Sequence, residues 1–309
     1  MINFRYHLVS LTAVFLALTV GLILGTAALN GPAMEALETT SQGLRDSNEQ
    51  LRAQVAQLED QLGEEQEFAA EIAPAYLSAK LTGKNILVVA LPGADTGAVD
   101  GAVEMLGYAG ATVSGRISVL DDFFDPTNAD QLVDLVDTAT PATVQTPVTY
   151  DGVQAMSYVL AAVTTGKAAG TAVEIAPGDI TTVTTALSEM SMLTVETAPT
   201  GLADGVLVLA GAGATDSDAD ARNTGMVTFT NEFAADGPTV YGAMTSTGDG
   251  NPLNALRADS AETVATVDNA AFTQGQIAAV AALAEFINSG TVDHLGIGEG
   301  ASALLPDAA

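Results

Sequence analysis

The chain offers few residues of the types that perform nucleophilic or acid–base chemistry. It has 309 residues and no cysteine, so thiolate catalysis, disulfides and cysteine-based zinc or iron–sulfur sites are excluded. Its two histidines are His7 and His294, and it has no G-x-S-x-G nucleophile elbow. A histidine-based triad would therefore depend on His294 alone. We expect a protein that is not an enzyme and that carries no cofactor.

Methionines and aspartates are the candidates for metal binding. Met190 and Met192 form one Met-x-Met pair, whose thioethers suit Cu(I), although methionines at a helix end more often pack in a core. Asp216, Asp218 and Asp220 lie in "GAGATDSDADA". This row lacks the glycine and the final glutamate of a calcium loop. We predict a solvated loop and no dedicated metal site, with weak cation binding as the alternative.

Three further aspartates, Asp121, Asp122 and Asp125, follow a predicted strand that ends at Leu120. The carboxyl ends of strands are where α/β proteins place their sites, and paired carboxylates can perform acid–base work. No basic residue lies near them in the sequence, so we assign them no catalytic role. The turn "LPGAD" (91–95) has too few glycines for a dinucleotide and is predicted to cap a helix.

The elements that would position these residues alternate between strand and helix. Strands are predicted at 83–93, 112–119, 204–211, 239–244 and 262–269. Helices are predicted at 95–111, 179–192, 221–237 and 273–287. This alternation indicates an α/β domain over residues 80–305, Rossmann-like or flavodoxin-like, with a mostly parallel sheet. Residues 120–175 are less regular and are predicted to form a helical insertion.

The N-terminus predicts a membrane anchor. Residues 8–29 contain no charge and would reach about 33 Å as a helix, which exceeds the ~30 Å hydrocarbon core and the length of a secretory signal. A cleaved signal is the alternative. Arg5 precedes this span, so residues 1–7 are expected in the cytoplasm and the rest outside, in a single-pass protein of the cytoplasmic membrane. Ala17, Gly21 and Gly25 form a small-residue stripe suited to pairing of membrane helices.

A sevenfold pattern follows and predicts a parallel dimeric coiled coil over residues 33–73. The break "NGP" (30–32) is expected to end or kink the first helix. Asn48 at one seam position would fix register and partner number. Beyond Leu62 the pattern decays, and a helix packed on its own domain is the alternative. The predicted seam residues are Met34, Leu37, Leu44, Asn48, Leu51, Val55, Leu58 and Leu62.

Charge limits the possible partners. The net charge is −29, and the residues from Gly63 onward contain 6 basic and 32 acidic side chains. Such a surface repels nucleic acids and anionic lipid headgroups, so no nucleic-acid partner is expected. A solvated acidic surface is the simpler interpretation, and a basic partner or a cation-rich environment is the alternative.

Several segments together resemble the MctB family of actinobacteria. They are "FRYHLVSLTAVFLALTVGLILGT", the heptad helix, "ILVVALPGAD", "DDFFDPTN" and "HLGIGEGASALLP". That family is described as copper transporters and includes the corynebacterial cell-separation protein SteB, whose branch this chain most resembles. The resemblance implies an envelope protein of a mycolate-bearing actinobacterium.

The SteB-like branch further implies a partnership with the membrane protein SteA and with a peptidoglycan hydrolase pathway. It implies a homodimeric scaffold in the lipid bilayer that acts in cell separation through control of peptidoglycan hydrolysis. Copper transport or copper homeostasis is the alternative function. Two histidines and one Met-x-Met pair form no copper transfer path, and one helix cannot line a channel.

Overall fold

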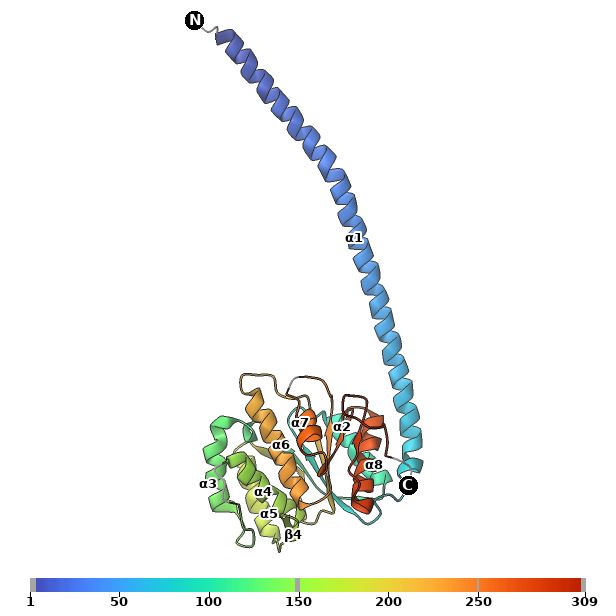
Figure 1. The fold of residues 1–309 in the computed structure, drawn as a ribbon, viewed down its shortest axis with the longest axis vertical. Coiled ribbons are helices and arrows are strands. Elements are labelled where there is room, and N and C mark those ends of the chain that lie inside the picture. Colours follow the sequence, from blue (N-terminus) through green and yellow to red (C-terminus); the bar gives the residue numbers. More distant parts are fainter. Residues whose placement is uncertain (1–3, 148–150, 249, 307–309) are drawn as a thin grey trace. The chain divides into compact units, whose positions relative to one another are not determined.

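The computed structural model describes residues 4–147, 151–248 and 250–306. It divides into two units, Met1–Glu65 and Gln66–Ala309. The first unit consists of most of helix α1 (Phe4–Leu77), and the second is an α/β head to which the last turns of α1 belong (Figure 1).

Helix α1 begins with a segment that could cross a membrane. Phe4–Thr26 spans 23 residues with a mean hydropathy of 2.4, which is compatible with a single membrane pass. Of the two expected alternatives at residues 30–32, an end or a kink, the end is not observed, because α1 continues without interruption from Phe4 to Leu77. A proline inside a helix removes one backbone hydrogen bond, and the bonds on both sides can maintain the helix across it.

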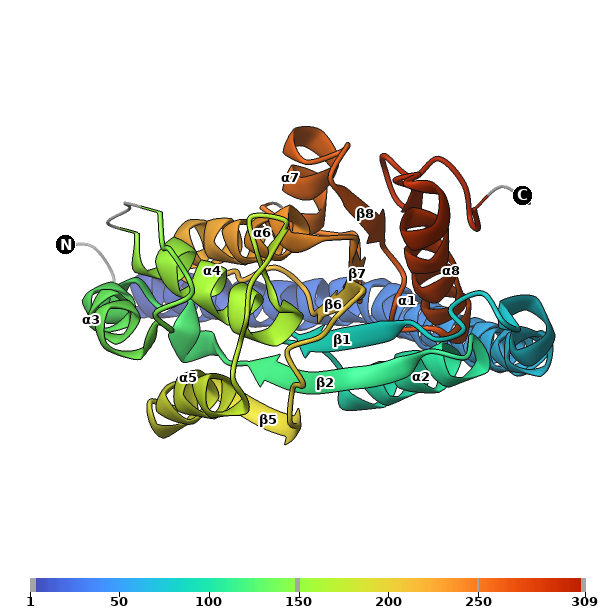
Figure 2. The ribbon, with the colours of Figure 1, turned by 90° about the horizontal axis from the view of Figure 1, so that it is seen from below.

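The head contains a seven-stranded sheet in the order β5-β2-β1-β6-β7-β8-β9 (Figure 2). Every pair in it is parallel except β2–β5. The central order, β2-β1-β6-β7-β8, is the doubly wound order of flavodoxin-like proteins. The strands are β1 (Asn85–Ala90), β2 (Thr112–Val119), β5 (Leu193–Thr197), β6 (Gly205–Ala210), β7 (Thr239–Ala243), β8 (Val264–Val267) and β9 (His294–Leu295). A separate hairpin pairs β3 (Lys167–Ala168) with β4 (Thr171–Ala172).

Helices cover both faces of the sheet, as the alternating pattern predicts. They are α2 (Thr96–Tyr108), α3 (Ala129–Ala139), α4 (Gly152–Thr165), α5 (Pro177–Glu189), α6 (Ala219–Asp236), α7 (Pro252–Asp259) and α8 (Thr273–Ser289). Two short 3-10 helices, η1 (Asp121–Phe123) and η2 (Pro126–Asn128), precede α3. Asp95 caps α2 as predicted, because its carboxylate accepts the Ala98 N–H at 2.9 Å.

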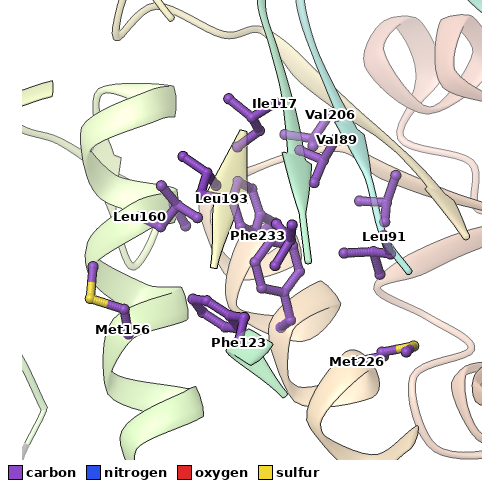
Figure 3. Close-up of a cluster of buried hydrophobic side chains, with 14 of the residues drawn as sticks. Val89, Leu91, Ile117, Phe123, Met156, Leu160, Leu193, Val206, Met226 and Phe233 are labelled. Atoms are coloured by element: carbon purple, nitrogen blue, oxygen red, sulfur yellow. The ribbon is translucent and has the colours of Figure 1, made fainter. Parts of the chain in front are cut away.

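Two hydrophobic clusters form the core, one for each face. One cluster joins the sheet to α3, α4, α5, α6 and α7, and Figure 3 shows part of it around Phe123, Leu160 and Phe233. The other cluster joins the opposite face to α2, α8 and the end of α1. Ala69 and Ala73, which we assigned to the coiled coil, are buried in this second cluster.

The crevice between β1 and β6 is closed by backbone. At this point the chain winds to opposite sides of the sheet, and doubly wound proteins bind ligands there. The Leu91 N–H donates to the Leu209 carbonyl at 2.7 Å, and the Gly211 N–H donates to the Pro92 carbonyl at 3.1 Å. A Cβ atom on Gly211 would contact the carbonyl carbon of Gly93. The two loops therefore pack directly against each other where a nucleotide would lie.

This contact predicts that Gly211→Ala destabilises the head strongly, by about 2 kcal/mol or more, since the methyl group has only rigid backbone to displace. Gly107→Ala is the matched control, because a methyl group at Gly107 in α2 would have nothing within 4 Å and should increase helix propensity. Chemical denaturation followed by circular dichroism measures both. Equal stability of the two variants would contradict the close packing of these loops.

Candidate functional site

Four charged residues from separate segments meet at the carboxyl edge of the sheet. Arg222 of α6 lies 3.5 Å from Asp121, 3.6 Å from Asp125 and 3.5 Å from Asp216. The expectation that these aspartates have no basic companion is therefore wrong. Arg222 is 101 positions beyond Asp121, and only the fold brings the two together.

The geometry of this cluster favours a structural link between two loops over a catalytic site. The Asp121 and Asp216 carboxylates are more than half exposed, and long ion pairs in water contribute at most about 1 kcal/mol. Hydrogen bonds from the side chain and backbone of Thr127, and then the charge of Arg222, lower the pKa of Asp125. A carboxyl with a lowered pKa is a poor general acid or base near neutral pH. The cluster links the η1–η2 segment to the loop between β6 and α6.

The row of Asp216, Asp218 and Asp220 does not converge on one point. The Asp216 carboxylate faces Arg222 and also accepts the Asp218 N–H at 3.2 Å. Asp220 instead lines grooves beside α6. Among the described residues, no group of three or more His, Cys, Asp or Glu side chains is arranged to hold a metal ion.

Two grooves flank the N-terminal half of α6 and share Asp220 and Thr224. One has a volume of about 640 Å³ and lies against η2 and the start of α4, and the other, of about 360 Å³, lies against α7. Their floors are largely apolar, and their charged lining residues are Asp151, Asp220 and Asp259. Such a surface is complementary to a basic, partly apolar protein segment and repels anions.

The methionine pair does not form an exposed thioether site. Met192 is 1% exposed and belongs to the core cluster on the face of α3 to α7, and Met190 packs against that cluster at the end of α5. Burial of this kind matches the core-packing interpretation of these residues. A Cu(I) site would require both sulfur atoms to face one open point.

His294 is held in a structural network. Its Nδ1 lies 2.9 Å from the Thr266 hydroxyl, and its Nε2 lies 3.1 Å from the Ala261 carbonyl. Arg257 Nε donates to the same hydroxyl at 3.0 Å, so the hydroxyl can in turn donate to Nδ1 while Nε2–H donates to Ala261. Burial lowers the pKa of His294, which favours this neutral ring. The Thr266 hydroxyl is 0% exposed, so it is not accessible for attack on a substrate.

A buried ion pair fixes the segment "HLGIGEG", and sequence reasoning missed it. Arg257 and Asp268 are 3.1 Å apart, with side chains 6% and 0% exposed. Asp268 also accepts the Ile297 and Gly298 N–H groups, each at 2.8 Å. Arg257 donates to the carbonyls of Leu295 and Glu299. Together these bonds hold the chain beyond β9 against the end of β8.

Asp236, at the end of α6, is a further perturbed group. Burial raises its pKa to about 6, although hydrogen bonds from the Gly170 N–H and the Thr165 hydroxyl, each at 3.2 Å, oppose that shift. Gly170 lies in the turn between β3 and β4. Asp236 therefore attaches this hairpin to the head.

These features define an α/β head at the end of a helix that is first apolar and then heptad-patterned. The family model described as "Copper transport outer membrane protein, MctB" matches residues 1–306, and the chain belongs to the MctB family. It is 28% identical to proteins named "Copper transporter MctB" from Mycobacterium bovis, Mycobacterium tuberculosis and Mycobacterium leprae. Each match covers 98% of this chain and 99% of the relative.

The two arginines should differ sharply in their contribution to stability. Arg257→Gln leaves Asp268 buried without its counter-charge and is expected to cost about 3–5 kcal/mol. Arg222→Gln breaks only ion pairs of 3.5–3.6 Å, two of them to aspartates that are more than half exposed, and is expected to cost about 1 kcal/mol or less. Denaturant unfolding of the two variants, side by side with the parent protein, gives the comparison. A larger loss of stability for Arg222→Gln would show that the ion pairs of Arg222, and not the buried Arg257–Asp268 pair, stabilise the carboxyl edge of the sheet.

Proposed function

We propose that the chain is a membrane-anchored, dimeric interaction protein of the cell envelope. Its heptad leucines carry this proposal. Leu37, Leu44, Leu51 and Leu58 are each 59–67% exposed on α1. A row of large apolar side chains at sevenfold spacing is costly in water and is typical of a helix that pairs with another.

A second copy in parallel orientation is the proposed partner of this helix. Two chains anchored in one membrane present their helices in the same direction and at high local concentration, which favours a seam of only four heptads. Asn48 of one copy would then pair with Asn48 of the other. Within the apolar segment, Gly21 and Gly25 have open space beside them, so a second membrane helix could approach closely.

The head is proposed to bind protein on its outer surface. The closed β1–β6 crevice leaves no usual nucleotide site, whereas the grooves beside α6 are open and acid-lined. In this proposal the N-terminus is cytoplasmic and the head extracytoplasmic, and the chain acts in cell separation with SteA by regulating peptidoglycan hydrolysis. Its resemblance to the SteB-like members of the family supports that partner and that process.

Replacing Leu44 and Leu51 with glutamate should dissociate the dimer and produce chains of unseparated cells, because each copy would bring two carboxylates into an apolar seam. The control replaces Gln50 and Ala53, at outer positions beside Leu51, with glutamate. Sedimentation of the full-length protein in detergent and microscopy of the cells measure the two effects. Normal separation in cells whose protein is monomeric would remove the main support for the proposal.

Copper transport or copper homeostasis is the second candidate function. It is favoured by the description of the family and by the names of relatives that match along nearly the whole chain. The chain itself offers Met190 and Met192 as soft ligands, of which Met192 is buried and Met190 partly buried.

The structure predicts that Met190→Leu with Met192→Leu leaves the fold and copper-dependent growth unchanged, because a core exchange of similar volume costs less than about 1.5 kcal/mol. Met156→Leu, another fully buried methionine, is the matched control. Growth in graded copper and calorimetry with Cu(I) at micromolar concentration give the result. Copper sensitivity of the double variant alone would favour the copper function.

A further inference from the structure

The last turns of α1 have two different faces within the head. Ala69, Ala73 and Leu77 are buried in the core cluster beside α2 and α8. Phe68 and Ile72, on the other side of the same turns, are 65% and 46% exposed. We refer to Phe68 and Ile72 as the outer flank of α1.

Exposure of this kind is unusual among the phenylalanines outside the apolar span. Among the described phenylalanines, Phe4, Phe15 and Phe68 are the exposed ones, and the first two lie in the apolar span. Phe68 lies 42 positions beyond Thr26, the end of that span. A large aromatic and a β-branched residue side by side on a helix surface indicate a contact with another molecule.

We propose that a second copy of this chain covers the outer flank, so that the dimer contact continues from the heptad helix onto the heads. The inference rests on the proposed coiled-coil dimer and extends it to the head unit. It assigns the flank to a self-complementary, two-fold interface.

The register of the helix supports this occupant. Ile72 is two heptads beyond Leu58 and so occupies the same seam position, and Phe68 lies at the flanking position before it. Fourteen residues of helix rise by about 21 Å, a small part of the ~150 Å pitch of a coiled coil. A partner helix that contacts Leu58 therefore remains a neighbour at Ile72.

The packing of the head explains why the sequence pattern decays at this point. Ala69 is one heptad beyond the seam residue Leu62, and it is buried in the core of its own chain. The partner can then contact only the remaining side of the helix, which carries Phe68 and Ile72. Glu65, at the seam position between Leu58 and Ile72, is exposed, and two facing carboxylates would push the helices apart there. The large ring of Phe68 is suited to filling a wider gap.

The absence of cysteine makes this contact directly testable in the full-length protein in membranes. Three single variants are compared by maleimide labelling, Phe68→Cys, Ile72→Cys and the control Glu67→Cys, which lies at an outer, exposed position. We expect at least tenfold slower labelling at 68 and 72 than at 67. Adding Leu44→Glu and Leu51→Glu should restore rapid labelling, since the protection comes from the second copy.

A fourth variant, Leu51→Cys, tests the coiled-coil dimer independently of the outer flank. Oxidation should link Leu51→Cys into a covalent dimer. If it does so while positions 68 and 72 label as fast as 67, the outer flank is not an interface and the inference fails, although the coiled coil stands. If Leu51→Cys does not link, the proposed dimer fails. Protection at 68 and 72 that persists in the Leu44→Glu, Leu51→Glu background would assign the flank to a different molecule and would also overturn the inference.

Discussion

The apolar side chains of one continuous helix, α1, have to be removed from water along its whole length. The organisation of the protein follows from that constraint, because three successive segments of α1 suit three different surroundings. Residues 8–26 carry no charge on any side of the helix, which suits lipid. The heptad leucines form a narrow exposed stripe, which suits one other helix. At Ala69, Ala73 and Leu77 the stripe consists of small or medium residues that fit against a sheet-covering layer of the same chain. The change in side-chain size and spacing along α1 therefore encodes a change in what covers it.

The head depends on close backbone packing and on one buried ion pair. Gly93 and Gly211 allow two loops to touch at the place where a doubly wound sheet usually opens to a ligand. Two of its three arginines have separate structural tasks. Arg257 neutralises a fully buried aspartate and holds the C-terminal segment, whereas Arg222 bridges exposed aspartates of two neighbouring loops. The grooves beside α6 have largely apolar floors and the carboxylates of Asp151, Asp220 and Asp259 as their charged lining, which is complementary to a basic, partly apolar protein surface.

The layers of the head were predictable from the sequence, because strands buried on both faces, such as β1 and β6, appear as apolar runs between turn signals. The edge strand β5 was missed, since four of its five residues are exposed and it carries no apolar run. The continuity of α1 could not be decided from the sequence, because the local preference of Pro32 favours an end or a kink whereas the segments on both sides favour a helix. Long-range polar contacts were the least predictable part of the candidate site. No local sequence pattern links Arg222 to Asp121, and none predicts the Arg257–Asp268 pair.

The residues of this chain limit the ways in which it could take part in copper transport, the function that the family description names. A single apolar helix has no lumen, and a pair of such helices packed through Ala17, Gly21 and Gly25 would have none either. Soft copper ligands in the chain are limited to methionines and two histidines, and His294 is engaged through both ring nitrogens. These residues favour a copper function in which the head acts through another protein. Both proposed functions thus depend on the same property, a dimeric head held at the membrane and open to a partner.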